Sequence, residues 1–191
     1  TWFGLGSFHP STAGKEAEIE PLLEHVGRVE LVDNIIAAKF MKLVLNAMAL
    51  GPVAMIDGDL ADTPPPGMNE FMMRLGDEAV IVGDALGLPI VPIFGLTKEE
   101  IESSNRPLQT LIDRVNHDIG PRGGANTTLQ DHIKGRFSEV DAINGFVVEE
   151  GAKRGIAAPA NAAIVEVTRR IFAGELKPGP ENLKLAIDLA G

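Results

Sequence analysis

The chain has 191 residues, a formal net charge of −10 at pH 7 and no cysteine. This length is enough for one substantial domain, which buries roughly 70% of its unfolded surface and needs neither disulfide nor metal for stability. The absence of cysteine excludes disulfides, thiolate chemistry and cysteine-based zinc sites. The acidic balance argues against nucleic acid as a partner, because phosphate binding needs clustered lysine and arginine.

The sequence also gives no sign of a membrane span or a signal peptide. No stretch approaches the ~20 uninterrupted apolar residues that cross a bilayer. Residues 1–6 lack the charged start and the long apolar run of a signal peptide. We therefore expect a cytoplasmic protein without membrane contact. Because the chain begins at Thr1 rather than methionine, we interpret it as a processed or excised piece.

Residues 1–33 predict a strand, a helix and a second strand. Residues 1–8 are apolar and aromatic, 15–25 place apolar residues at helical spacing, and 28–32 alternate apolar and charged residues. Strand, helix, strand is the tail of an α/β unit, and so few elements cannot bury a sheet face by themselves. We interpret residues 1–33 as an α/β remnant whose other strands are missing.

Almost every segment after residue 34 predicts a helix. Residues 35–56 are apolar on nearly every face, which is typical of a buried helix. Pro52 is expected to kink or end this helix. A stiff turn is predicted at 62–67 and a loop at 120–124. A capping box at Thr97 and Glu100 predicts the start of one helix, which a break at 105–107 interrupts. Ser138 is expected to cap the helix over 138–155. The other predicted helices cover 68–87, 108–119, 127–134, 160–173 and 181–190.

Two polar residues on the apolar helix are candidates for chemistry. Lys42 and Asn46 are four residues apart, so both side chains point the same way. A lysine in so apolar a helix is costly unless it has a carboxylate partner or faces a cleft. The alternative is that Lys42 buries its stem and keeps its ammonium in water.

A second cluster, over 127–131 and 135–145, is dense in small polar and acidic residues. Acids near a helix start also serve as caps, because the helix dipole stabilises them. Asp141 and Asn144 are equally consistent with a structural hydrogen-bonded pair. The four histidines are scattered without acids at metal-ligand spacing, so no metal site is predicted.

Three segments in register resemble the ketopantoate reductase family. They are KLVLN at 42–46, TTLQD at 127–131 continued by GR at 135–136 and EVDAING at 139–145, and GIAAPAN at 155–161. The resemblance extends over roughly residues 30–172 and implies a two-domain NADPH-dependent enzyme.

The resemblance implies that residues 1–33 are the tail of a Rossmann cofactor-binding domain. Residues 34–191 would be the helical substrate-binding and catalytic domain, of the 6-phosphogluconate dehydrogenase C-terminal type. The expected fold class is thus mainly α with a small α/β remnant. The glycine fingerprint for the pyrophosphate is absent, so NADPH would be bound mainly by the missing Rossmann domain, and the isolated chain is expected to be inactive.

The resemblance also assigns roles by position. Lys42 matches the catalytic lysine and Glu139 a conserved glutamate that we place with it in the catalytic set. Asn46 and Thr127 match substrate-contacting positions, and Asp141 in the same acidic cluster completes the predicted site. Hydride transfer to a ketone leaves negative charge on oxygen, which an ammonium stabilises and protonates. A nearby carboxylate favours the charged lysine and accepts a hydrogen bond from the new hydroxyl.

The chain departs from the family pattern at three positions. Phe40 replaces the usual tryptophan, and Leu50 and Leu60 stand where asparagines are expected. Two lost amides reduce the hydrogen-bonding capacity for a polar hydroxy acid. The family resemblance makes ketopantoate the default substrate. The two lost amides favour the alternative, a less polar 2-keto acid or ketone.

Two other functions are considered. The first is a non-catalytic helical domain that serves dimerisation or ligand sensing, and a homodimer through the helical domain is compatible with either function. The second is a relative of 3-hydroxyacid dehydrogenases, whose histidine–glutamate chemistry finds no matching histidine here. Retention of Lys42, Asn46 and Glu139 favours the reductase.

Overall fold

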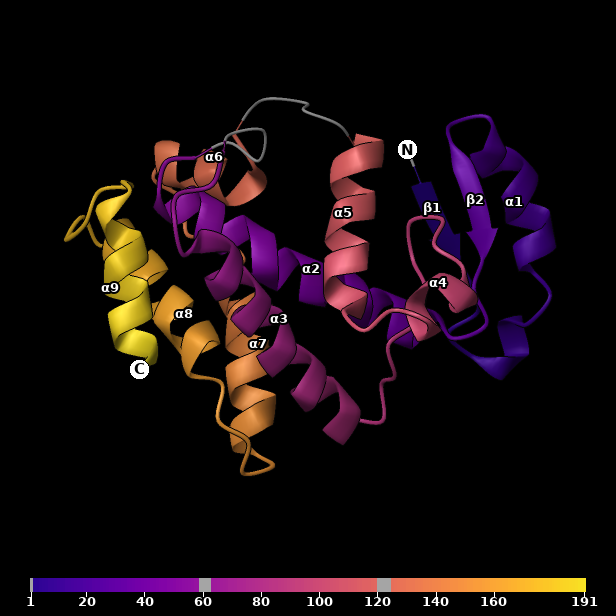
Figure 1. The fold of residues 1–191 in the computed structure, drawn as a ribbon. Helices are drawn as coiled ribbons and strands as arrows, with labels where there is room; N and C mark the ends of the chain where they lie inside the picture. The colour runs from indigo at the N-terminus through magenta and orange to yellow at the C-terminus, as the bar shows by residue number, and fades with distance from the viewer. Residues whose placement is uncertain (1, 59–62, 120–124) are drawn as a thin grey trace.

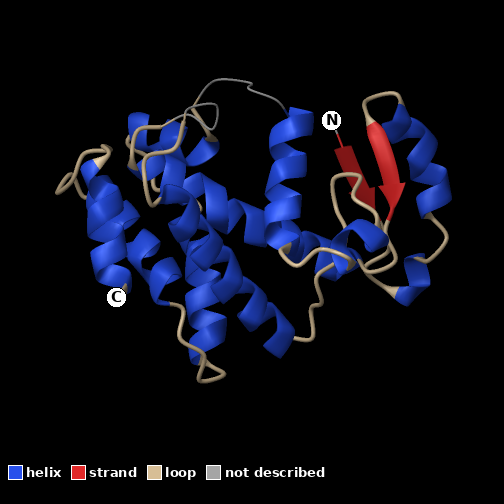
Figure 2. Ribbon diagram, in the orientation of Figure 1, coloured by secondary structure: helices blue, strands red, loops and turns tan. Residues whose placement is uncertain are grey.

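The computed structural model describes residues 2–58, 63–119 and 125–191. A small α/β part at the N-terminus lies beside a larger body of helices (Figures 1 and 2). Its strands β1 (Trp2–Leu5) and β2 (Arg28–Leu31) pair in parallel, with Trp2 opposite Arg28. A 3₁₀ helix (Pro10–Thr12) and α1 (Glu16–Glu24) connect them. The two strands and α1 are as predicted, whereas the 3₁₀ helix was not predicted.

The long apolar helix α2 (Ile35–Met55) forms the centre of the helical body. Asn34 caps it, since its side-chain oxygen accepts a hydrogen bond of 3.0 Å from the Ala37 amide. By length and composition α2 is able to cross a membrane, but it packs against α3, α6, α7 and α8 as a core helix does. The helix continues through Pro52 to Met55, so of the two effects expected of Pro52, a kink or a helix end, the end does not occur.

The remaining helices follow the predicted order and make the fold mainly α, as expected. The turn predicted at 62–67 is described only from Thr63 onward, where residues 63–67 are not helical, and the loop predicted at 120–124 lies outside the described residues. The helices are α3 (Met68–Ala85), α4 (Lys98–Glu102), α5 (Pro107–Ile119), α6 (Thr127–Ile133), α7 (Val140–Ala152), α8 (Pro159–Phe172) and α9 (Glu181–Ala190).

Two predicted helix caps have opposite outcomes. The capping box of α4 is confirmed, because the Glu100 amide donates to Thr97 Oγ1 at 3.2 Å and the Thr97 amide donates to Glu100 Oε2 at 2.7 Å. The cap assigned to Ser138 is wrong. Ser138 is buried, its hydroxyl has no hydrogen-bond partner among the described residues, and α7 starts one residue after Glu139. Burial in the core takes this side chain away from the helix end.

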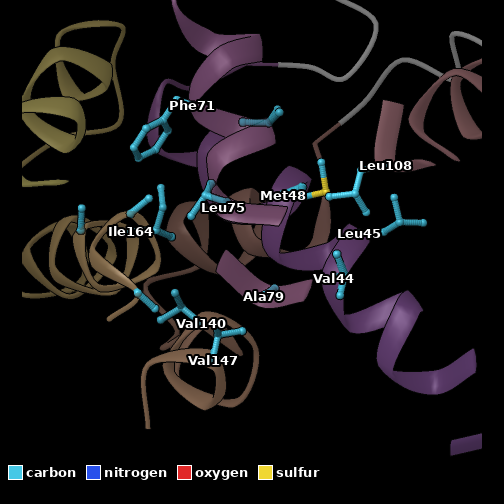
Figure 3. Close-up of a cluster of buried hydrophobic side chains, with 14 of the residues drawn as sticks. Val44, Leu45, Met48, Phe71, Leu75, Ala79, Leu108, Val140, Val147 and Ile164 are labelled. Carbon is cyan, nitrogen blue, oxygen red and sulfur yellow. The ribbon is translucent and has the colours of Figure 1, made fainter. Parts of the chain in front are cut away.

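The core is built around the contact between α2 and α3. Figure 3 shows side chains of α2, among them Met48, packed against α3, α7 and α8. Two glycines of α3 allow this close approach: a methyl group at Gly76 would collide with Met48, and one at Gly83 with the Phe40 ring. Phe40 is itself buried, so the position where the family carries tryptophan is a packing position here.

A buried carboxylate caps the start of α8. Glu78 of α3 accepts hydrogen bonds from the backbone amides of Ala160 at 2.9 Å and Asn161 at 3.0 Å. These are the first-turn N–H groups that a helix cannot satisfy internally, and a negative charge is favourable at this end of the helix dipole. Glu78 thereby attaches α8 to α3.

Candidate active site

A cavity of about 820 Å³ opens between α2, α3 and α5. Lys42, Asn46 and Leu50 of α2 all line it, because residues four apart lie on one face of a helix. The predicted pair of Lys42 and Asn46 thus shares one cavity. The facing surface comes from Met68, Met72 and Met73 of α3 and from Gln109, Ile112 and Asp113 of α5.

Lys42 lies where the cavity meets solvent. Its side chain is exposed, so the ammonium remains hydrated while the residue lines the cavity. Among the described residues none forms an ion pair with Lys42. Asn46, one turn further along α2, is half-buried. The arrangement presents an ammonium and an amide together, which are suitable donors for the oxygens of a keto acid.

Asn126 connects the cavity to α6. Its side-chain oxygen accepts a hydrogen bond of 2.9 Å from the Leu129 amide and caps the helix. Its side-chain nitrogen donates to the Leu50 carbonyl at 3.1 Å. Thr127, the first residue of α6, is therefore held near the Leu50 end of α2, although it is exposed and is not among the described lining residues.

The acidic members of the predicted site lie elsewhere in the described structure. Glu139 is exposed at the start of α7 and is not among the described residues that line the cavity. Asp141 accepts a hydrogen bond of 2.9 Å from Arg169 and lines a separate groove of about 420 Å³ between α7 and α8. The side-chain nitrogen of Asn144 donates hydrogen bonds to the Ala47 carbonyl and to the Asn161 side-chain oxygen. The hydrogen-bonded pair of Asp141 and Asn144 that the sequence allowed is therefore not formed among the described residues.

The sequence interpretation missed most of the apolar wall of the cavity. Met68, Met72 and Met73 lie in the helix predicted over 68–87, and in the structure they pack in or against the core and also line the cavity. An amphipathic pattern shows that a helix has a buried face but not whether a cavity lies against it. The same holds for α5, whose Ile112 was predicted only as part of a helix.

Two residues at the cavity have left-handed backbone. Asp57 has φ 58° and Phe94 has φ 56°, and among the described residues these are the non-glycine positions with positive φ. Such backbone costs of order 1 kcal/mol or more and is concentrated at functional sites. Phe94 also packs on Trp2, with ring centroids 4.9 Å apart, so β1 reaches the edge of the cavity.

The described residues do not fit the phosphate end of a dinucleotide. Such a site needs a glycine-rich turn whose amides open a helix. Here Gly6 after β1 packs closely against the Val32 carbonyl, where a Cβ would lie 2.5 Å from the oxygen, so this glycine serves a tight backbone contact. The donors at the cavity, an ammonium and an amide, fit carbonyl or carboxylate oxygens of a small molecule instead.

The segment that carries these groups matches a known family. Residues 34–172 match the sequence pattern described as ketopantoate reductase PanE/ApbA, C-terminal. The chain belongs to this family. This confirms the resemblance drawn from the three motifs.

Relatives of known sequence support the assignment. The chain is 30% identical over 138 residues to the 2-dehydropantoate 2-reductase of Caulobacter vibrioides. The aligned segment covers 72% of this chain and 42% of that protein. It is 26% identical over 156 residues to the 2-dehydropantoate 2-reductase of Pyrococcus horikoshii. This alignment covers 78% of this chain and 46% of that protein. The chain thus spans less than half the length of these curated relatives.

A solved structure shows the same fold at lower identity. D-mandelate dehydrogenase in a ternary structure with NADH and anilino(oxo)acetate has a TM-score of 0.74 and 19% sequence identity. The match covers 91% of this chain and 67% of that chain. At this identity the likeness concerns the fold.

Proposed function

We propose that this chain is the catalytic domain of an NADPH-dependent 2-keto acid reductase that resembles 2-dehydropantoate 2-reductase. The observation that supports this most is the joint position of Lys42 and Asn46 on the cavity of a ketopantoate reductase family domain. The substrate is a small keto acid. A cytoplasmic location and a homodimer through the helical domain belong to the same proposal. The exposed rings of Phe137 and Phe172, which contact each other, support a surface for contact between two subunits.

Lys42 acts as the general acid. When bound, the reduced nicotinamide supplies the hydride that the ketone carbon accepts. The electron pair of the C=O bond then moves to the oxygen, and Lys42 Nζ donates a proton to it and forms the hydroxyl. An ammonium beside the developing alkoxide stabilises it before the proton is transferred. Asn46 orients the same oxygen or the neighbouring carboxylate.

Glu139, Thr127 and Asp141 complete the proposed site. In this proposal Glu139 is catalytic and accepts a hydrogen bond from the hydroxyl that forms, while Thr127 and Asp141 contact the substrate. The hydrogen bond from Asn126 to Leu50 supports Thr127, because it holds the start of α6 against the cavity end of α2. Glu139 is not among the described residues that line the cavity and Asp141 is paired with Arg169, so these two roles rest on the family resemblance by position.

The cofactor assignment is also a proposal. Most of the dinucleotide would be held by a Rossmann cofactor-binding domain, and the preference for NADPH over NADH would be set there. The D-mandelate dehydrogenase of the same fold is described with NADH. Comparing the two cofactors at equal concentration in a steady-state assay decides between them.

The test uses the product of the complete gene with NADPH or NADH and a panel of 2-keto acids that includes 2-dehydropantoate. We expect reduction of at least one keto acid, and Lys42→Ala is expected to lower kcat by about 10²- to 10⁴-fold, as loss of a general acid does. Lys39→Ala is the matched control, because Lys39 is an exposed lysine on the same helix that is not among the described lining residues.

A non-catalytic dimerisation or ligand-sensing domain is the alternative. It predicts no turnover with any member of the panel and equal behaviour of the Lys42→Ala and Lys39→Ala variants. It also predicts that a keto acid changes the oligomeric state without being consumed, which light scattering with and without ligand would detect.

A further inference from the structure

We propose that Leu50, Val53, Met68 and Met72 form an apolar subsite that selects 2-keto acids with a bulky apolar or aryl substituent. This inference rests on the proposed reductase function and names its substrate class. The same cavity holds the polar pair of Lys42 and Asn46, so one site would bind the reacting end and the substituent.

The order of residues on α2 sets the direction of the substrate. An α-helix rises 1.5 Å per residue, so Leu50 lies roughly 6 Å beyond Asn46 and roughly 12 Å beyond Lys42 along the axis. The keto and carboxylate oxygens belong at the end with the ammonium and the amide. The substituent on the keto carbon then extends toward Leu50, over a distance that suits a phenyl ring or a branched alkyl chain.

The wall around Leu50 is apolar on more than one element. Val53 continues the face of α2, and Met68 and Met72 oppose it from α3. Val53 and Met68 are buried, whereas Leu50 and Met72 are half-buried and present part of their surface to the cavity. Methionine is unbranched and polarisable and adapts to rings and branched chains.

Apart from Lys42, Asn46 and the half-buried Gln109, the polar side chains that line the cavity lie on its exposed rim. The Leu50 carbonyl accepts a hydrogen bond from the Asn126 side chain, which fixes the backbone of this residue. Asp57, Asn69 and Asp113 line the cavity but are exposed to solvent. The two aspartates place negative charge at the rim, which disfavours a second carboxylate on the substrate. Apolar monocarboxylic keto acids are the class that fits these surroundings.

The kinetic test compares phenylglyoxylate, 4-methyl-2-oxopentanoate, 2-dehydropantoate and 2-oxoglutarate with the product of the complete gene. We expect kcat/KM for the two apolar acids to exceed that for 2-dehydropantoate by about tenfold or more, since one methylene in a fitted pocket already changes it about 10- to 200-fold. Leu50→Asn should shift this ratio toward 2-dehydropantoate by at least about tenfold, and Leu50→Met should keep it. Ile36→Asn, an exposed position near the start of α2 outside the described lining, is the control for a polar substitution in this helix.

A binding test separates this inference from the proposed function. Calorimetric titration with pyruvate and with phenylglyoxylate, in the presence of oxidised cofactor, measures the apolar contribution without turnover. Tighter binding of phenylglyoxylate that is lost in Leu50→Asn supports the subsite even if no keto acid is reduced, in which case the proposed function fails alone. A preference for 2-dehydropantoate with no effect of Leu50→Asn on the ratio or on binding overturns the subsite while leaving the reductase intact.

Discussion

The side-chain amide of Asn144 in α7 donates a hydrogen bond of 2.9 Å to the side-chain oxygen of Asn161 in α8, and both residues are buried. Asn144 also donates to the Ala47 carbonyl of α2 at 3.1 Å. Asn161 in turn donates to the Leu75 carbonyl at 3.1 Å and to Glu78 at 2.9 Å. The two asparagines therefore tie α2, α3, α7 and α8 together next to the helix segment that carries Asn46.

Replacing Asn144 by leucine removes both of its donors and leaves the Asn161 oxygen without its partner. An unsatisfied buried polar group costs about 1–3 kcal/mol, so we expect the free energy of unfolding to fall by about that amount. Urea denaturation followed by circular dichroism measures this change. Asn105→Leu, at an exposed position, is the control and should change stability little. Equal stability of the two variants would contradict the structural role of the pair.

Gly83→Ala tests the close contact of α2 and α3. The added methyl would collide with the buried Phe40 ring, and overpacking of this kind costs about 1–3 kcal/mol. Gly145→Ala is the matched control in α7, because its nearest atom would lie at 3.6 Å and alanine favours a helix by up to about 1 kcal/mol. Thermal unfolding should show a lower Tm for the first variant and an equal or higher Tm for the second.

The collision itself has a rescue test. If Phe40 is the obstacle, Phe40→Leu combined with Gly83→Ala should recover part of the lost stability, so that the two changes are not additive. A double mutant whose loss equals the sum of the two single losses would show that the cost at Gly83 has another origin.

His132 of α6 makes stability depend on pH. Burial lowers the pKa of its imidazole below the usual 6.5, and the Ala54 backbone and the charge of Asp131 oppose this in part. A base whose pKa is lower in the folded state is protonated more readily in the unfolded state. Its contribution is therefore fully present above pH 6.5 and is lost as the pH falls from there through the folded-state pKa.

We expect the free energy of unfolding to decrease as the pH falls from 7.5 to 5, and His132→Gln to flatten this part of the profile. Urea denaturation at half-unit pH intervals measures both proteins. His25→Gln, in the exposed residue that follows α1, should leave the profile unchanged. The same slope in the wild-type chain and in His132→Gln would assign the pH dependence to other groups.

Asn126 has two functions that substitutions can separate. Asn126→Asp keeps the oxygen that caps α6 but loses the donor to Leu50, whereas Asn126→Ala loses both. Loss of a helix cap costs about 1 kcal/mol, so only the alanine variant should lose that much stability. Both variants should raise KM for the keto acid if Asn126 positions Thr127 beside the cavity. A change of stability alone, with KM unaffected, would leave Asn126 only its capping function.

Short-range patterns in the sequence determined much of this protein. Helical periodicity placed the helices and put Lys42 and Asn46 on one face of α2, because residues four apart always share a face. The capping box at Thr97 and Glu100 was readable for the same reason, since its partners are three residues apart. The three motifs sufficed to identify the family.

Contacts between distant segments were decided only by the tertiary structure. Asp141 takes Arg169 as its partner, 28 residues away, and Asn144 reaches Ala47 across 97 positions. Ser138 enters the core instead of capping α7, and the methionines of α3 become a wall of the cavity as well as core. Local hydrogen bonds and periodicity act within a few residues, whereas a cavity wall or a buried pair depends on which helix faces meet when the whole chain packs.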